Sequence, residues 1–416
     1  MSCLQESSLV NESFRVPTMS GNFKKVDVLT GPFDPGGQPE TRIGQPLELG
    51  FFAWNIKGGM TASKAVLSDP QRLQNYWEWP NSMRLVQLAE EVGFDYQVPF
   101  GRWLGQGGAT DYNGAALDFL ASAAATAPIT KRLGLFSTAH ITYRFHPLHI
   151  AKFGATIDHI SGGRWGLNIV SGYSEREMAA FGFKQPIGHD QAYDMADEFV
   201  CLMKYLWSET ERFDFEGKYY QAYGALVAPR PTRNPRPILM NAALSDKGID
   251  FGVRHCDWVF TEMPTLEGYR ERTNYIHNLA AKYGRHVRVA TMCWVVAAPT
   301  DQEAQATYEW IEAEIDHEAV LNFINSLSST REARLAGKTT GKEPWGGVGK
   351  ERYIRIALGI MSPQIVGSYQ TVAEKLRALH ETGLESLLIC FFDPQKGLHQ
   401  MQDDVIPILK KMGLRK

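Results

Sequence analysis

The segment between Ala155 and Tyr173 constrains the fold of this chain more than any other. A helical stretch ending in Ile-Asp-His-Ile meets Ser-Gly-Gly-Arg, where the glycines permit the positive φ that closes a helix. The next residues, Trp165 to Val170, form a nearly continuous apolar run, as expected of a strand covered on both faces. Asn168 is the one amide in that run. Because ligands bind at the carboxyl end of strands in a parallel α/β barrel, Asn168 is a candidate site residue.

Seven other apolar runs alternate with amphipathic stretches from Pro46 onward. One such stretch, Asn81–Val92, places its apolar side chains on one helical face. The alternation predicts an α/β fold and favours a (β/α)8 TIM barrel with insertions rather than an open sheet. The eight predicted strands are Leu47–Ala53, Asp95–Pro99, Leu133–Thr138, Trp165–Val170, Pro237–Asn241, Trp258–Thr261, Val287–Ala297 and Ser386–Phe392.

Composition narrows the class of protein. A chain of 416 residues with 44% hydrophobic residues has a large core, and a net charge of −3 without basic clusters argues against nucleic-acid binding. It contains no run of 18 apolar residues and no secretory signal pattern. We therefore expect a cytoplasmic protein. Metal-ligand spacing is absent, and the odd, widely spaced cysteines predict reduced thiols: Cys3, Cys201, Cys256, Cys293 and Cys390.

Three segments interrupt the pattern. Residues 1–45 are rich in Ser, Gly, Pro and Asn and predict a flexible or surface-wrapping N-terminal extension, which leaves 46–416 as the barrel domain. Residues 207–236 predict a short hairpin or loop excursion. Residues 326–367 are rich in Ser, Thr, Gly and Lys. An irregular segment of that length inside a barrel is usually functional, so we expect a mobile lid there.

Several residues near the predicted strand ends could carry chemistry. Ser245 is a suitable N-cap for a helix whose free amides would attract phosphate, although an ordinary capped helix is equally compatible. Arg102 lies just beyond the second strand and is either an anion partner or a solvated loop cation. His140 and His146 follow the third strand, where each is either a general acid or base or a structural histidine.

The 155–173 segment resembles the reduced-flavin-dependent monooxygenases of the bacterial-luciferase-like family, in the branch of alkanesulfonate, dimethylsulfone and pyrimidine monooxygenases. The resemblance extends over about residues 46–412. Asn55-Ile-Lys-Gly-Gly-Met-Thr-Ala-Ser-Lys64 is similar to a dimethylsulfone monooxygenase motif. Pro99-Phe-Gly-Arg102 and Trp345-Gly-Gly-Val-Gly-Lys-Glu-Arg352 are similar to motifs of alkanesulfonate monooxygenases, and the second of these belongs to the family's lid.

The resemblance implies roles for individual residues. The FMN phosphate is expected at Ser245 and Tyr193, although Ala192 stands where relatives carry Arg. Arg352 is expected near the sulfonate of a substrate. We assign catalysis to Thr138, Asn168, Arg352 and His140. The expected cofactor-binding residues are Val98, Gly101, Arg102, Thr138, Asn168, Glu177, Tyr193 and Ser245, of which Val98, Thr138 and Asn168 match the oxygen-reacting face.

Some positions depart from the alkanesulfonate pattern. Met292-Cys293-Trp294 replaces Arg-x-His on the seventh strand, Phe392 replaces Tyr, and Glu262 stands where relatives carry Trp. We therefore expect a more apolar floor, which suits a neutral sulfone or another small apolar or heterocyclic molecule at least as well as a sulfonate.

The function implied by the resemblance is that of a two-component monooxygenase. It would take FMNH2 from a separate NAD(P)H:FMN reductase and use O2 to oxidise a small organosulfur compound, a sulfone or alkanesulfonate, with C–S cleavage. A homodimer or homotetramer is expected. Two alternatives remain: a ring-opening oxygenase of a pyrimidine-like amide, and an F420-dependent hydride-transfer oxidoreductase on the same fold.

Overall fold

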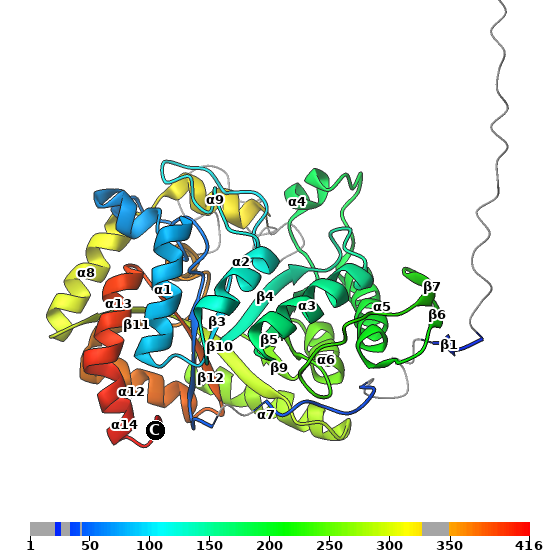
Figure 1. Ribbon diagram of the computed structural model, residues 1–416. Helices are drawn as coiled ribbons and strands as arrows, with labels where there is room; N and C mark the ends of the chain where they lie inside the picture. The colour runs from blue at the N-terminus through cyan, green and yellow to red at the C-terminus, as the bar shows by residue number, and fades with distance from the viewer. Residues whose placement is uncertain (1–20, 26–33, 42–43, 327–348) are drawn as a thin grey trace, which may run out of the picture.

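A parallel barrel forms the centre of the molecule (Figure 1). The computed structural model describes residues 21–25, 34–41, 44–326 and 349–416. Within these residues, eight strands follow one another around a ring that closes because β10 pairs with both β9 and β12, and β12 pairs with β2. The ring strands are β2 (Glu48–Phe52), β3 (Tyr96–Val98), β4 (Gly134–His140), β5 (Trp165–Val170), β8 (Ile238–Ala242), β9 (Trp258–Phe260), β10 (Arg288–Ala298) and β12 (Ser386–Phe391). The predicted (β/α)8 barrel is confirmed.

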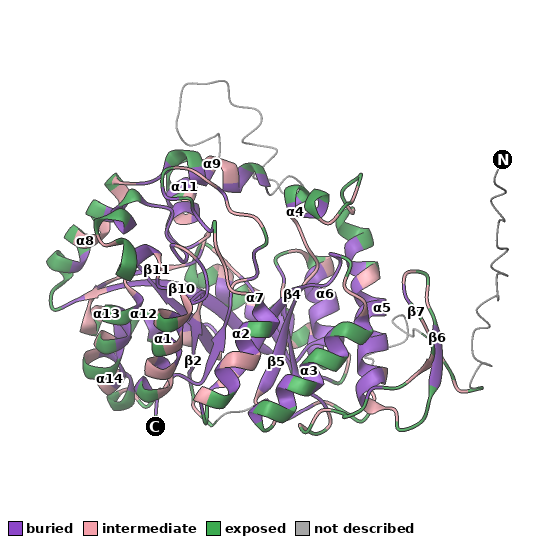
Figure 2. Cartoon of the chain, turned by 45° about the horizontal axis from the view of Figure 1, so that its top comes forward, coloured by how far each residue is buried: buried purple, intermediate pink, exposed green. Residues whose placement is uncertain are grey.

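Helices cover the outside of the barrel, with their buried faces toward the strands (Figure 2). Helix α3 shows why they begin and end where they do: the His146 side chain caps its first turn, and Gly162 ends it with a φ of 67°. The helices are α1 (Trp79–Val92), α2 (Phe119–Thr126), α3 (Pro147–Ser161), α4 (Glu175–Ala180), α5 (His189–Ser208), α6 (Asp246–His255), α7 (Leu266–Lys282), α8 (Asp301–Ala313), α9 (His317–Ser326), α11 (Lys350–Ala357), α12 (Tyr369–His380), α13 (Pro394–Gln400) and α14 (Ile406–Lys411). Short 3-10 or π turns, η1 (Lys64–Ser68), η2 (Pro70–Gln74), η3 (Ala127–Ile129) and η4 (Met401–Val405), complete the regular structure.

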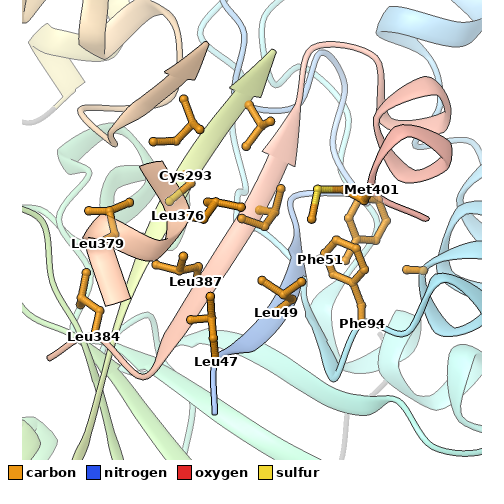
Figure 3. Packing of buried hydrophobic residues seen from close by; sticks show 14 of the residues in the cluster. Leu47, Leu49, Phe51, Phe94, Cys293, Leu376, Leu379, Leu384, Leu387 and Met401 are labelled. Carbon is orange, nitrogen blue, oxygen red and sulfur yellow. The ribbon is translucent and has the colours of Figure 1, made fainter. Parts of the chain in front are cut away.

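The hydrophobic core has two layers. Between strands and outer helices, Leu49 and Leu387 of the barrel pack in one buried cluster with Leu376 of α12 (Figure 3). Inside the barrel, the rings of Tyr96 and Trp258 meet edge to face at 4.9 Å. The amino-terminal end of the barrel is filled by such rings and by a buried ion pair, so only its carboxyl end is left for a ligand.

The predicted hairpin within residues 207–236 is present. Strands β6 (Phe213–Glu216) and β7 (Gln221–Ala225) pair in antiparallel fashion, and β1 (Phe23–Lys24) adds to β6. Asp34 lies 2.7 Å from Arg236 and 2.6 Å from Arg285. The described parts of the N-terminal extension are therefore held against the barrel domain.

Most of residues 350–368 are regular, whereas we expected residues up to 367 to belong to an irregular lid. They contain α11 and β11 (Gln364–Ser368), which pairs with the far half of β10 outside the ring. Residues 327–348, including the Trp345 end of the family motif, lie outside the described residues, so the lid stays a prediction.

Four cysteines lie within the described residues. Cys201, Cys256, Cys293 and Cys390 are all buried and free, as the odd count predicted, and Cys3 lies outside the described residues. None of the helices in the described part of the chain has the length and apolar character needed to cross a membrane.

Candidate active site

A cavity of about 700 Å³ opens at the carboxyl ends of the barrel strands. Its volume lies within the usual range for small-molecule and cofactor sites. Apolar residues from several strands form most of its wall, including Phe52, Met240, Met292 and Leu388. The predicted site residues that line it are Gly101, Thr138, Asn168, Tyr193, Ser245 and Arg352.

One end of the cavity is a cluster of hydroxyl and imidazole groups at the start of α6. Ser245 caps this helix, accepting a hydrogen bond from the Gly248 amide at 3.1 Å. Burial raises the pKa of Tyr193, and hydrogen bonds with Ser171 and Ser245 oppose that rise. A Cβ on Gly248 would lie 2.4 Å from the Tyr193 hydroxyl, so only glycine admits this approach. Helix amides and converging hydroxyls suit a phosphate.

His189 completes this cluster and was missing from the predicted site. Its Nε2 lies 3.0 Å from the Ser245 Oγ, and its ring lines the cavity from the first turn of α5. The sequence predicted a missing cationic partner because Ala192 replaces Arg. His189 stands three residues earlier and is the basic group that the fold brings to Ser245, although its place in the same short segment was the only signal.

Thr138 and Asn168 lie side by side further along the cavity, on the adjacent strands β4 and β5. Both are buried, at 5% and 7% exposure. The Asn168 amide donates to the Thr138 Oγ1 at 3.2 Å, and that hydroxyl donates to the Pro99 carbonyl at 2.7 Å. The Asn168 Oδ1 is buried without a partner among the described residues. A ligand with an N–H group could satisfy it.

Arg102 and Glu177, both predicted to bind the cofactor, lie behind the cavity wall and face each other. Arg102 Nη1 is 3.6 Å from Glu177 Oε1, and each side chain is 1% exposed. Glu177 also accepts the backbone amide of Trp103 at 2.8 Å. Neither side chain is among the lining groups. Their burial favours a supporting role, in contrast to the solvated or ligand-facing positions considered from the sequence.

Val98 and His140 also lie beneath the surface of the cavity. Val98 is fully buried in the barrel interior. His140 is 1% exposed and stacks on Tyr143 at 5.0 Å. Burial lowers the pKa of His140 to about 4, with Glu177 opposing the shift. The imidazole is neutral at physiological pH, which argues against the predicted role as a general acid. Gly101 does line the cavity, and a Cβ there would lie 3.0 Å from both His140 and the Thr138 carbonyl.

Arg352 and Glu262 also line the cavity. Arg352 reaches it from α11, with its Nη2 3.8 Å from the Met361 sulfur. Glu262 reaches it from the residues after β9, and both its carboxyl oxygens are inaccessible to solvent. Met292 lines the cavity, but Cys293 and Trp294 are fully buried. The expected apolar floor is present except at Glu262.

Within the described residues, no three His, Cys, Asp or Glu side chains are grouped so that they could hold a metal ion.

A model of the luciferase-like monooxygenase family matches residues 50–386. The match includes the barrel strands that carry the polar side chains of the cavity. The chain belongs to the luciferase-like monooxygenase family, which confirms the predicted family and enzyme class.

Among its relatives, the chain is 28% identical over 371 residues to the FMNH2-dependent dimethylsulfone monooxygenase of Pseudomonas putida, covering 89% of this chain and 97% of that protein. It is also 28% identical over 337 residues to the pyrimidine monooxygenase RutA of Acinetobacter baylyi, covering 78% and 86%.

Solved structures agree on the architecture. Riboflavin lyase RcaE matches with a TM-score of 0.78 at 23% identity, covering 89% of this chain and 93% of that one. DmoA from Hyphomicrobium sulfonivorans matches with a TM-score of 0.73 at 21% identity, covering 89% of each chain. At these identities the likeness supports the fold alone.

Proposed function

We propose that this protein is a two-component monooxygenase that uses FMNH2 and O2 to oxidise a small organosulfur compound, a sulfone or alkanesulfonate, with cleavage of a C–S bond. The observation that carries the proposal is the cavity, which has a phosphate-type cluster at Ser245 and a buried, unpartnered amide oxygen at Asn168. The dimethylsulfone monooxygenase relative, aligned over 97% of its length, supports the choice of flavin and substrate.

The residues present fit FMN. Ser245, Tyr193 and His189, with the amides at the start of α6, would hold the phosphate. Asn168 would accept a hydrogen bond from a ring N–H through its buried Oδ1. Gly101 and Gly172 allow the cavity wall to pack closely, since a Cβ on Gly172 would lie 2.5 Å from the Tyr143 ring.

When bound, reduced FMN supplies the electrons that activate O2 for insertion of one oxygen atom into the substrate, and the other oxygen leaves as water. The protein binds and orients the reactants. Thr138 fixes the orientation of the Asn168 amide, and the apolar wall of Met240, Met292 and Leu388 keeps bulk water from the reacting centre. Oxygen insertion at the carbon next to sulfur would release an aldehyde, together with a sulfinate from a sulfone or sulfite from a sulfonate.

We also expect a separate reductase to deliver FMNH2, because the proposed reaction consumes the flavin in reduced form. We also expect a homodimer or homotetramer. The buried free thiols are compatible with the reducing cytoplasm.

A pyrimidine-like amide is the second candidate substrate. The RutA relative of Acinetobacter baylyi has the same 28% identity over a shorter stretch, and a carboxyl at Glu262 could hydrogen bond an amide. The difference between the two candidates lies in the product, because the amide would lose a ring C–N bond.

Chemically reduced FMN should be mixed with the enzyme, air and one of a panel comprising dimethyl sulfone, short alkanesulfonates and uracil. The proposal predicts O2 uptake coupled to aldehyde release with an organosulfur member. Uracil opening would favour the second candidate. Substrate oxidation without O2 uptake, dependent on a deazaflavin such as F420, would contradict both.

A further inference from the structure

Glu262 occupies an unusual position for a carboxyl group. It follows β9 by two residues and lines the cavity, as does Phe260, the last residue of that strand. Although the residue as a whole is partly exposed, both carboxyl oxygens are buried, and neither has a hydrogen-bond partner in the described part of the chain. A buried polar group with no partner calls for an explanation, and a ligand is one.

The surroundings of Glu262 disfavour a charged carboxylate. Most side chains that line the same cavity are apolar, Met292 and Leu388 among them, and such side chains cannot replace lost hydration. Burial raises its pKa well above the usual value, and the Arg355 guanidinium opposes that rise only in part. Arg355 donates to the Met361 carbonyl. The other ionisable groups that interact with Glu262 are Tyr269, Cys293 and Cys390, and burial raises the pKa of each, which keeps them neutral.

A protonated carboxyl group has one O–H to donate, whereas a carboxylate can only accept. A donating role for Glu262 rests on the proposed function, because a donor in the cavity needs a substrate that carries an acceptor oxygen. We propose that Glu262 is held as a neutral carboxylic acid and donates its O–H to the sulfonyl or carbonyl oxygen of an uncharged substrate. Glu262 is then a specificity-determining residue.

The charge balance of the cavity favours an uncharged substrate. Arg352 is the only Lys or Arg among the lining groups of the described residues; Glu175 lines the same cavity, and Glu262 as a neutral acid adds no positive charge. An anionic substrate beside Glu262 would lose most of its hydration, and methionine and leucine side chains could not replace it. A neutral sulfone or amide loses far less hydration free energy on entering the cavity, and a hydrogen bond from the Glu262 O–H offsets part of that loss.

Two substitutions separate the possible roles of Glu262. Glu262→Gln keeps the shape and a donor without any charge, so kcat/KM for dimethyl sulfone should stay within several-fold of the original. Glu262→Met removes the donor, so kcat/KM should fall roughly 10- to 100-fold. The affinity for FMN should stay unchanged in both, and Glu267→Gln, an exposed site in the same segment, serves as control. Loss of activity in Glu262→Gln, or none in Glu262→Met, would overturn the proposal.

A second measurement does not depend on turnover. Infrared difference spectra of the enzyme loaded with oxidised FMN should show the carbonyl stretch of a protonated acid that is absent from Glu262→Gln. This band should shift when dimethyl sulfone is added, and a shift with uracil alone would point to the amide. Absence of the band, or no shift with either compound, would contradict the proposal even if sulfone oxidation were confirmed. A shift without any oxidation would leave Glu262 as the binding group and reject the proposed reaction.

Stability supplies a third check. A group whose pKa is raised on folding stabilises the fold fully only below its unfolded pKa, and that contribution is lost as pH rises toward the folded value. The Tm of Glu262→Gln, measured relative to the Tm of the original enzyme, should therefore increase as pH rises from about 5 to about 8. A Tm difference that does not change with pH would show that Glu262 titrates normally.

Discussion

Asn168 donates its side-chain amide to the Thr138 Oγ1 at 3.2 Å, directly across the β4–β5 pair. Since that hydroxyl is committed to the Pro99 carbonyl, its lone pairs face Asn168 and fix which end of the amide it holds. The amide oxygen is left buried and without a partner among the described residues. This relationship turns an ordinary strand pair into a preset acceptor for a ligand N–H.

Replacing Thr138 by Val should disturb this acceptor without removing it. We expect product formed per FMNH2 to fall about tenfold or more and H2O2 release to rise, because the amide is no longer held in one orientation. The affinity for FMN should change by less than about threefold, since the phosphate cluster is intact. Ser137→Ala is the matched control: its hydroxyl donates to the Phe119 carbonyl on the outer side of β4, so it should cost stability and leave coupling unchanged.

Arg352→Ala should affect charged substrates most. We expect kcat/KM for any alkanesulfonate that is turned over to fall by about 100-fold, because a guanidinium contact to an anion is lost in a partly dry cavity. Steady-state rates with dimethyl sulfone should fall by less than about tenfold. Equal losses with both compounds would show that Arg352 does not discriminate by charge.

His140 should make the fold sensitive to acid. Its pKa is about 4 in the folded protein, because of burial, and about 6.5 when unfolded. The unfolded state therefore binds the extra proton between these values, and stability is lost as pH falls from about 6.5 to about 4, by about 3 kcal/mol in total. Urea unfolding of His140→Asn should show a flatter pH profile. The same substitution at the exposed His399 should leave the profile unaltered.

Asp34 should anchor the N-terminal extension. Burial raises its pKa, but Lys204, Arg236 and Arg285 outweigh burial and hold the pKa well below its usual range. Asp34→Asn removes one carboxylate from this buried cluster, although Arg236 and Arg285 keep Asp257, so the free energy of unfolding should drop by about 3 kcal/mol. Asp69→Asn, which breaks the exposed pair with Arg72, should leave the free energy of unfolding nearly unchanged in the same urea titration. Similar losses in both variants would contradict the anchoring role.

The barrel could be predicted because its signals are local. Each buried parallel strand is an apolar run between helical patterns, and Trp165–Val170 was predicted residue for residue. Strand β11 was missed because Gln364–Ser368 is short and lies next to a Gly- and Ser-rich segment. It is stabilised by pairing with the far half of β10, about 70 residues earlier in the sequence, and no local pattern shows that pairing.

The site was predicted less completely, because burial and pairing are not visible in a sequence. Strand-end position located Thr138, Asn168 and Ser245 correctly at the cavity. Arg102 and Glu177 were both expected to face the cofactor, yet they pair with each other across 75 residues of chain. Similarly, a substitution of Glu for Trp at position 262 gave no sign that both carboxyl oxygens would be buried without partners.

The central claim is that one flavin nucleotide lies along the cavity with its phosphate at Ser245. The most direct test compares the Kd of FMN with that of riboflavin, which lacks the phosphate, for the original enzyme, Ser245→Ala and Thr265→Ala. Thr265 caps α7 in the same way, outside the cavity, and controls for loss of a helix cap. We predict that the original enzyme and Thr265→Ala prefer FMN by about tenfold or more, and that Ser245→Ala loses most of that preference. An unchanged preference in Ser245→Ala would contradict the claim.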